Sequence, residues 1–411
     1  MKKIIFTNLL NPVSWDKAEY QAQVFITIEE NRILSISKDV KDNSITVDDM
    51  SDCVCYPGFI DLHTHIYQYN IRGSYKSHLL EWLNTFTFPE ERKTSESDYS
   101  NFLAAIAFDD LVKSGTSTAC IYSTIFKNAF ETAFNQAEKK GIRAIIGKVM
   151  MDVNSPEYLT ENTEQSINDS IELFNKYNKL NPLLEYCFTP RFALSCSFNL
   201  MQRTGIFVKN NSSYIQTHIS ENKDEIESVK KYFSNSTSYT DIYAQADLLT
   251  PKTLLAHAIH LNNTELSIIR KARSSIVHCP DSNFFLKSGE FPLDRIINHQ
   301  IPFGLGSDVG AGTTFYMPYH ARMMIYRQNK YQVSPFNAFY SFTLGAAEAL
   351  RKANIIGSIK PLKYADMTFI KQETDTNDME TILSKLIFTS TQNDVKKLIV
   401  NGLEVYKNIE I

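Results

Sequence analysis

Short apolar segments alternate with longer amphipathic segments along most of this chain, from Pro57 to Asp308. This alternation is typical of successive units of one β-strand and one α-helix, which build parallel sheets. Helix-like segments such as 97–115, 127–141 and 222–233 lie between the apolar runs, and several end on glycine or a basic residue. Eight segments are expected to be strands: 57–65, 116–122, 143–150, 183–190, 213–218, 253–257, 274–278 and 301–308. Eight such units predict an α/β protein with a closed, TIM-like (β/α)8 barrel.

The two ends of the chain have a different pattern. Residues 23–36 form alternating strand material, and residues 361–411 include two apolar runs that flank Asn401-Gly402, a strong hairpin signal. The first residues, MKKIIFTNLLN, are expected to form a strand rather than a signal peptide, because polar residues interrupt a short apolar run. We therefore expect segments 1–56 and 361–411 to form a small composite β-sandwich domain beside a barrel domain of residues 57–360.

Composition and charge narrow the class of protein further. Of the 411 residues, 43% are hydrophobic and 21% are charged, the balance of a soluble globular protein with a large core. The net charge is −4 with no long run of either sign, and no run of about 18 apolar residues occurs, so neither nucleic acid nor a membrane is an expected partner. The six cysteines are scattered, which favours free thiols in a reducing, cytoplasmic compartment. The absence of H-x-E and P-C-x-x-C motifs excludes the zinc deaminases that carry both.

Residues that could bind a metal lie at the ends of the expected strands. The carboxyl ends of barrel strands meet at one mouth, so such side chains are expected to converge although they are far apart in sequence. His63 and His65 are two residues apart, which places both on the same face of a strand. A single histidine is usually a core or surface residue, but a set of imidazole and carboxylate groups indicates a site for one Zn²⁺, with Fe²⁺ as the alternative. The full set is His63, His65, His218, His257, His278 and Asp308.

Glu221 follows His218 by three residues, in the sequence HISE. A carboxyl group there would start the next loop, close to the metal, and could carry a proton from water to a substrate nitrogen. The alternative is an acidic residue in the first turn of the following helix. Glycine also gathers around the first and last ligands, where the backbone turns sharply or approaches a ligand closely. Five of the 14 glycines lie there: Gly58, Gly304, Gly306, Gly310 and Gly312.

Seven segments of the chain resemble the amidohydrolase superfamily, over nearly the whole length. They are PGFIDLHTHIYQY, LLEWLNTFTFPEE (79–91), TPRFALSCS (189–197), QTHISENKDE (216–225), LLAHAIHL, VHCPDSNFFLKSG (277–289) and GLGSDVGAGTTF (304–315). The first motif and the terminal aspartate mark the superfamily broadly. The LLEWL-x-x-x-TFP-x-E and TPRF-x-LSCS segments are more specific, and they resemble the guanine deaminase family within it.

The resemblance implies roles for individual residues. Carried over by position, the metal ligands would be His63, His65, His218 and Asp308, with His257 beside the ion. The substrate would be a small purine, guanine, contacted by Gln68, Trp82, Arg191, Phe192 and Glu221. Asp308 would take a proton from the attacking water, Glu221 would protonate a ring nitrogen, and His257 would stabilise the tetrahedral oxygen. The products would be xanthine and ammonia, and the family also implies a homodimer.

The chain departs from the family pattern beside two of its motifs. Ala258 stands where the family usually has a glycine, His260 follows it, and Asp281 turns the usual CPN motif into CPD. None of these residues belongs to the expected ligand set, so they bear on the shape of the pocket wall. Lys148 does not indicate a carboxylated lysine between two metals, because binuclear relatives carry that lysine at the fourth strand, where this chain has Arg191.

Two alternative functions remain open from the sequence. The same ligands could serve deamination of another amino-heterocycle, such as a pterin, an 8-oxopurine or a triazine, or hydrolysis of a cyclic amide. The fold also serves as a non-catalytic scaffold, although such chains lose metal ligands and this chain keeps all of them. A panel of substrates would distinguish the first alternative from guanine deamination, and metal analysis would distinguish the scaffold from an enzyme.

Overall fold

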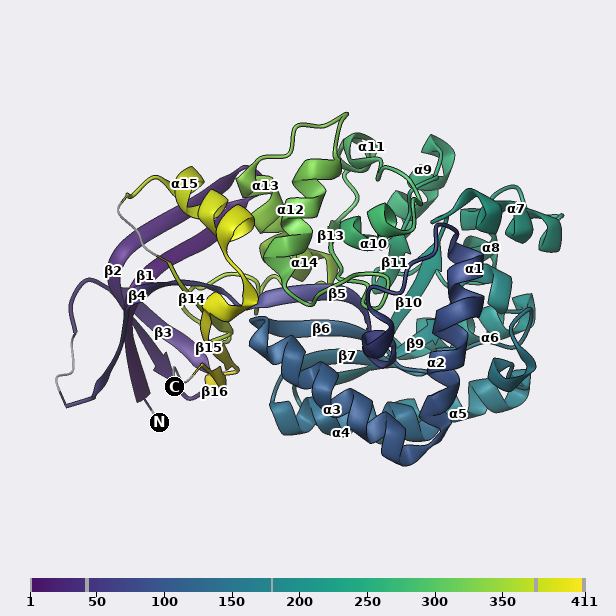
Figure 1. The fold of residues 1–411 in the computed structure, drawn as a ribbon, viewed down its shortest axis with the longest axis horizontal. Helices are drawn as coiled ribbons and strands as arrows, with labels where there is room; N and C mark the ends of the chain where they lie inside the picture. The colour runs from purple at the N-terminus through teal and green to yellow at the C-terminus, as the bar shows by residue number, and fades with distance from the viewer. Residues whose placement is uncertain (1, 41–43, 179, 373–375, 409–411) are drawn as a thin grey trace.

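A computed structural model describes residues 2–40, 44–178, 180–372 and 376–408 of the chain. A barrel of parallel strands with helices around it makes up the larger part of the molecule, and a separate sheet lies beside it (Figure 1). The predicted α/β class with a (β/α)8 barrel is confirmed. The barrel strands are β5 (Phe59–His65), β6 (Thr116–Tyr122), β7 (Arg143–Gly147), β9 (Leu184–Pro190), β10 (Tyr214–Ile219), β11 (Thr253–His257), β12 (Ser275–His278) and β13 (Phe303–Leu305).

The barrel is closed by the segment that follows β13. The backbone N–H of Asp308 donates to the carbonyl oxygen of His63 at 2.8 Å, and the N–H of His65 donates to the carbonyl oxygen of Val309 at 2.9 Å. All eight predicted strand segments are strands in the structure, with two differences. The third is interrupted at Lys148, so that a short strand β8 (Val149–Met150) pairs with β9, and the eighth ends early, at Leu305.

Helices connect the strands and pack apolar faces against them. The helix α4 buries Ala129, Phe130, Ala133, Phe134 and Ala137, a helical spacing, and it ends at Gly141 with a φ of +69°. The helix α7 starts with a capping box of Asn222 and Glu225. The barrel helices include α3 (Ser97–Lys113), α4 (Lys127–Lys140), α5 (Thr163–Tyr177), α6 (Phe198–Asn211), α7 (Lys223–Tyr232), α8 (Tyr239–Gln245), α9 (Asn263–Ala272), α10 (Pro280–Phe285), α11 (Leu293–Asn298), α12 (Met317–Arg327), α13 (Pro335–Ser341) and α14 (Leu344–Ala349).

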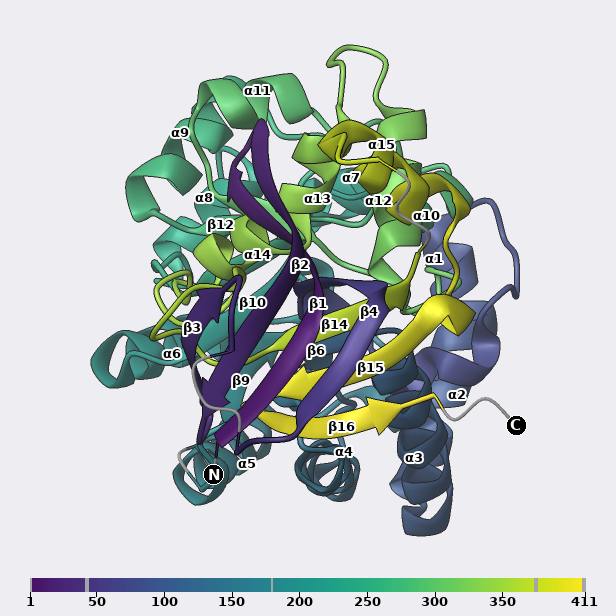
Figure 2. The ribbon, with the colours of Figure 1, turned by 90° about the vertical axis from the view of Figure 1, so that its left-hand side faces the viewer.

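Both ends of the chain contribute strands to one mixed sheet of seven strands, in the order β16-β15-β14-β4-β1-β2-β3 (Figure 2). The predicted joining of the two ends is confirmed, and within the described residues these strands belong to a single hydrogen-bonded sheet. The predicted hairpin at Asn401-Gly402 joins β15 to β16, and both turn residues have a positive φ, as a type I′ turn requires. The strands are β1 (Lys2–Ser14), β2 (Lys17–Glu29), β3 (Arg32–Ser37), β4 (Val47–Pro57), β14 (Met367–Lys371), β15 (Val395–Val400) and β16 (Leu403–Lys407).

The chain passes from this sheet into the barrel within a few residues. Strand β4 ends at Pro57 and β5 begins at Phe59, with Gly58 between them. A Cβ atom on Gly58 would lie 2.4 Å from Ser117 Oγ on β6, so the close approach of the two strands requires glycine there. The C-terminal segment also contributes a helix, α15 (Met379–Ser384), which follows β14 in the sequence.

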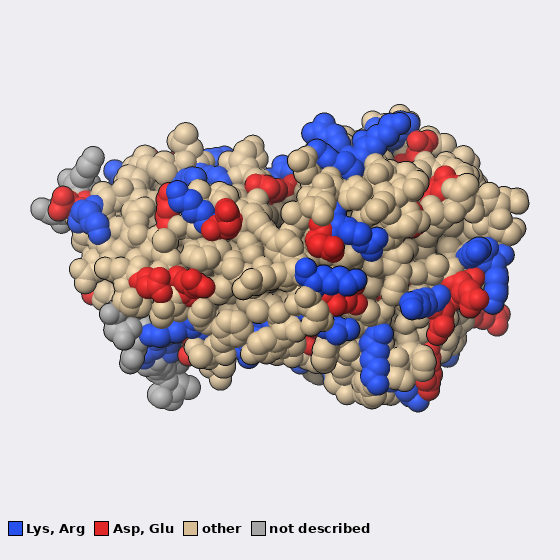
Figure 3. Space-filling model, turned by 90° about the horizontal axis from the view of Figure 1, so that it is seen from above, with Lys and Arg blue, Asp and Glu red and all other residues tan. Residues whose placement is uncertain are grey.

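The surface carries both signs of charge. On the face drawn in Figure 3, Lys and Arg side chains are interspersed with Asp and Glu side chains. Within the described part of the chain, no helix is both long enough and apolar enough to cross a membrane.

Candidate metal and substrate site

Four of the predicted ligands meet at the carboxyl end of the barrel strands. His63 and His65 come from the end of β5, His218 from β10, and Asp308 from the loop after β13. Their ligand atoms all lie within 4.8 Å of one another. The distances are 3.2 Å from His63 Nε2 to Asp308 Oδ1, 3.4 Å from His65 Nε2 to the same oxygen, and 3.3 Å between His65 Nε2 and His218 Nε2. Ligands at about 2.1 Å from a tetrahedral zinc ion lie about 3.4 Å apart, so the spacing fits one ion.

The protonation of the histidines also fits a metal. The Nδ1 atom of His218 lies 2.7 Å from the carbonyl oxygen of Arg191, to which it can only donate, and this leaves Nε2 as the lone-pair atom that faces the cluster. His63 Nε2 is buried and has no hydrogen-bond partner. Burial lowers the pKa of His63 to about 3, and it lowers the pKa of His65 and of His218 well below the usual value. Neutral imidazoles are the form that binds a metal.

Asp308 lies three residues beyond the end of β13 rather than at the end of a strand. The chain leaves the strand at Gly306, where an added Cβ would lie 2.7 Å from His63 Cβ. The φ angles of Gly304, Gly306, Gly310 and Gly312 are not positive, so the cluster serves close approach rather than left-handed turns. Burial raises the pKa of the Asp308 carboxyl above its usual value, and a bound cation would act in the opposite direction.

Glu221 and His257 form a second layer beside the ligands. His257 Nε2 lies 3.5 Å from Glu221 Oε2 and 3.9 Å from Asp308 Oδ2. The amide Nδ2 of Asn283 lies 2.9 Å from His257 Nδ1, and as donor it places the His257 proton on Nε2, towards the two carboxyl groups. Burial raises the pKa of Glu221 well above its usual value, and the charges of Asp308 and Glu225 act in the same direction. A carboxyl whose pKa is raised holds its proton to a higher pH, which suits a general acid.

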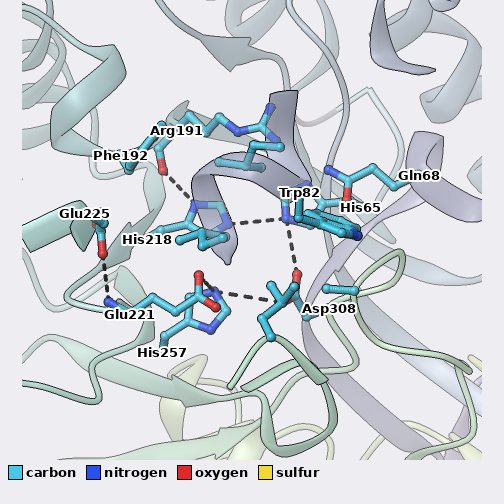
Figure 4. Close-up of a pocket in the computed structure, with 14 residues that line it drawn as sticks. His65, Gln68, Trp82, Arg191, Phe192, His218, Glu221, Glu225, His257 and Asp308 are labelled. Carbon is cyan, nitrogen blue, oxygen red and sulfur yellow. Dashed lines mark hydrogen bonds and ion pairs between the residues drawn. The ribbon is translucent and has the colours of Figure 1, made fainter. Parts of the chain in front are cut away.

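A cavity of about 440 Å³ opens directly beside this cluster (Figure 4). Its wall includes the predicted ligands His65, His218 and Asp308, together with apolar side chains of Leu79, Leu83 and Leu286. All five side chains expected to contact the substrate line it as well: Gln68, Trp82, Arg191, Phe192 and Glu221.

The polar groups of this wall are already oriented. Trp82 Nε1 donates to the carbonyl oxygen of Ser74 at 2.8 Å, so the indole offers its ring to the cavity rather than its N–H. Gln68 and Arg191 are 2% and 3% exposed, and each is held by the carboxylate of Glu91. Ser288 Oγ donates to Glu221 Oε1 at 2.9 Å.

Other predicted or discussed residues lie outside this arrangement. His278 does end β12, but within the described residues it belongs to neither group of four that could hold a metal, and its ring stacks on Phe291 at 4.1 Å between centroids. Lys148 is buried and pairs with Glu161 at 2.5 Å, away from the cavity wall. A second group that could hold a metal consists of Cys279, His63, His257 and Asp308. It shares His63 and Asp308 with the first group.

The three departures from the family pattern have distinct surroundings. Ala258 has a φ of +52°, a left-handed conformation that glycine adopts more easily. His260 Nε2 lies 2.8 Å from the carbonyl oxygen of Ser288, the residue whose hydroxyl group donates a hydrogen bond to Glu221. Asp281 accepts hydrogen bonds from the N–H and the hydroxyl of Thr313, both at 2.8 Å, and so anchors the loop that follows Asp308.

Sequence reasoning missed three residues that hold the site: Glu91, Asn283 and Ser288. Each lies inside a segment that carries the family resemblance, in LLEWLNTFTFPEE or in VHCPDSNFFLKSG. The available signal was a polar side chain within a segment that carries the family resemblance, but the partner of each one is set by tertiary packing.

Comparisons with known proteins identify the family of this chain. The amidohydrolase family profile matches residues 54–405, which include every predicted site residue. Guanine deaminase of Escherichia coli (strain K12) is 34% identical over 377 residues, 89% of this chain and 86% of that protein. Guanine deaminase of Dictyostelium discoideum is 32% identical over 446 residues, 98% of each.

Solved structures give the same result. Guanine deaminase from C. acetobutylicum, with bound guanine in the active site, has a TM-score of 0.94 at 32% identity and covers 99% of this chain and 100% of its own. E. coli guanine deaminase has a TM-score of 0.94 at 29% identity and covers 100% of both chains. Atrazine chlorohydrolase from Arthrobacter aurescens, complexed with zinc, shares the fold at 16% identity, with a TM-score of 0.88 over 98% of this chain and 95% of its own.

Proposed function

The chain belongs to the amidohydrolase family, and we propose that it is a guanine deaminase, which hydrolyses guanine to xanthine and ammonia. One observation carries the proposal. A single cavity is lined by the proposed substrate contacts Gln68 and Arg191 on one part of its wall and by the proposed proton shuttle Glu221, close to the ligand cluster, on another. The guanine deaminases among its relatives support the choice of substrate.

We propose that His63, His65, His218 and Asp308 hold one Zn²⁺, with Fe²⁺ as the alternative. Three nitrogen ligands and one oxygen ligand suit either ion. When bound, the ion would lower the pKa of a water molecule to near neutrality. Asp308 would accept a proton from the attacking water and orient it towards the carbon that carries the amino group of guanine.

The second layer completes the proposed reaction. Glu221 delivers its proton to a ring nitrogen of guanine, which makes the amino-bearing carbon more open to attack. His257, with its proton on Nε2, donates a hydrogen bond to the oxygen that develops a negative charge. The proton taken up by Asp308 passes to the amino group, which leaves as ammonia, and the proton of the new hydroxyl group returns to Glu221, so guanine and water give xanthine and ammonia. The ring of Phe192 and the indole of Trp82 pack against the purine.

Three further features stay predictions. The family resemblance supports a homodimer, and the six unpaired, buried cysteines support a reducing, cytoplasmic compartment. The segments 1–56 and 361–411 are proposed as one domain, and residues 57–360 as the other.

Ammonia release from a substrate panel tests the function. We expect the purified protein to release ammonia from guanine with a higher kcat/KM than from adenine, cytosine, 8-oxoguanine or a pterin. We also expect a chelator to abolish the activity and Zn²⁺ or Fe²⁺ to restore it. Greater activity on another amino-heterocycle would favour that substrate instead. A protein that binds no metal, even after zinc is added, would favour the scaffold.

A further inference from the structure

Glu91 is a buried carboxylate that joins the two side chains expected to contact the purine edge. It lies on α2 (Phe88–Arg92) and is 1% exposed. Its Oε1 accepts a hydrogen bond from Gln68 Nε2 at 2.8 Å, and its Oε2 accepts one from Arg191 Nη1 at 2.6 Å. The cavity is lined by both partners and not by Glu91 itself, so any effect of Glu91 on a ligand acts through them.

The contact with Glu91 determines which way the Gln68 amide faces. An ionised carboxylate only accepts hydrogen bonds, so the Gln68 atom beside it is the amide nitrogen, and Oε1 points the other way. That oxygen lies 3.5 Å from the backbone nitrogen of Gly310, at the limit of a hydrogen bond. It therefore keeps the capacity to accept a hydrogen bond from a ligand N–H. Without Glu91, the long contact with the Gly310 N–H is left to oppose a rotation that exchanges this acceptor for a donor.

The same carboxylate supplies the counter-charge of Arg191. A buried guanidinium without a partner is strongly unfavourable, and this guanidinium is 3% exposed. Phe88, on the same short helix, places its ring 5.3 Å from the guanidinium carbon. Glu91 occupies Nη1, and the remaining N–H groups of Arg191 stay available as donors to a carbonyl oxygen in the cavity.

We propose that Glu91 is a positioning residue that sets the substrate specificity of this site, an inference that rests on the proposed function. It fixes a charged donor at Arg191 and an acceptor at Gln68 on one wall of the cavity. This pair matches a purine that carries an oxygen at C6 and a ring N–H. A site built to hydrogen-bond a substrate group discriminates strongly against an analogue that lacks it, because its own polar groups are then left unpaired.

The test compares guanine with 2-aminopurine, which has the same reacting amino group but no oxygen at C6. The variant is Glu91→Gln, whose single side-chain oxygen cannot replace both of the carboxylate oxygens that accept hydrogen bonds from Gln68 and Arg191. Glu90→Gln is the matched control, because Glu90 is a neighbouring carboxylate, 4% exposed, that pairs with Lys93 and Tyr99 and does not line the cavity. Metal content and thermal unfolding are measured for each protein.

We expect Glu91→Gln to lower kcat/KM for guanine at least about 30-fold, mainly through a higher KM, as for the loss of one partner of a buried charge pair. The kcat/KM for 2-aminopurine should change much less. The ratio of kcat/KM for guanine to kcat/KM for 2-aminopurine should therefore fall. Glu90→Gln should keep the wild-type ratio. If Glu91→Gln does not fold, Glu91→Asp, which is too short to reach both partners, is measured in the same way.

An equal loss on both substrates, or a lower kcat with an unchanged KM, would mean that Glu91 is only structural and would overturn the inference. So would a ratio unchanged from the wild type. Wild-type protein without activity on guanine would overturn the proposed function, and the inference with it. The two failures are therefore distinguishable by the wild-type measurement alone.

Discussion

Replacing Glu221 by glutamine removes one ionisable proton and leaves the surroundings almost unchanged. Glutamine has the same heavy-atom shape, and its carbonyl oxygen can still accept the hydrogen bond that Ser288 Oγ donates at 2.9 Å. The four proposed ligands are not altered, so the metal content should stay at the wild-type level. General acid–base catalysis contributes about 10²–10⁴-fold. We therefore expect kcat to fall by this factor, which corresponds to about 2.7–5.4 kcal/mol in the barrier.

Steady-state ammonia release from guanine is the assay, with metal analysis of the same preparations. Glu265→Gln is a suitable control, because Glu265 is also a buried carboxylate, accepts hydrogen bonds from Thr240 and Asn262, and does not line the cavity. Its substitution should affect stability more than turnover. Full turnover of Glu221→Gln would refute the assigned role. A loss of metal together with activity would also refute the reasoning, because the effect would then come from the ligand cluster.

Two further outcomes are expected. Gly306→Ala should destabilise the protein by about 1–3 kcal/mol, since its Cβ would lie 2.7 Å from His63 Cβ, and chelator competition should show weaker metal binding. Gly58→Ala is the control, because its added Cβ would contact Ser117, which lies away from the ligand cluster, so it should lower stability but not metal affinity. Equal metal affinity in the two variants would contradict the reasoning. Burial raises the pKa of all six cysteine thiols, that of Cys196 to about 12, so at pH 8 the native protein should not react with Ellman's reagent until it is unfolded. Rapid labelling of the native protein would contradict this.

The sequence predicts the barrel well because its elements are local patterns. Each expected strand is a short apolar run that the structure also has as a strand, and the hairpin at Asn401-Gly402 follows from turn chemistry within two residues. Strand ends were less predictable. The third strand breaks at Lys148, and the eighth stops at Leu305 because the chain must pass close to His63.

The supporting residues of the site could not be predicted in the same way. Glu91 is 23 residues from Gln68 and 100 from Arg191, and only tertiary packing brings the three side chains together. The same holds for Asn283, whose amide meets His257 across 26 residues. A motif shows that such residues are present, but the atoms they bond to depend on the placement of whole helices. Ligands at strand ends are easier to predict, because barrel geometry alone directs them to one end of the barrel.

Barrel closure and the ligand cluster are one feature of this fold. The first strand carries His63 and His65, and the last loop carries Asp308, and two backbone hydrogen bonds join these segments at the ligand positions. Gly306 allows the approach, because any side chain there would push against β5. The carboxylate is thereby held 3.2 Å from His63 Nε2 and 3.4 Å from His65 Nε2. A metal ion held by the proposed ligands of both segments would therefore stabilise the contact between β5 and the loop after β13, and this contact would in turn hold the ligands close together.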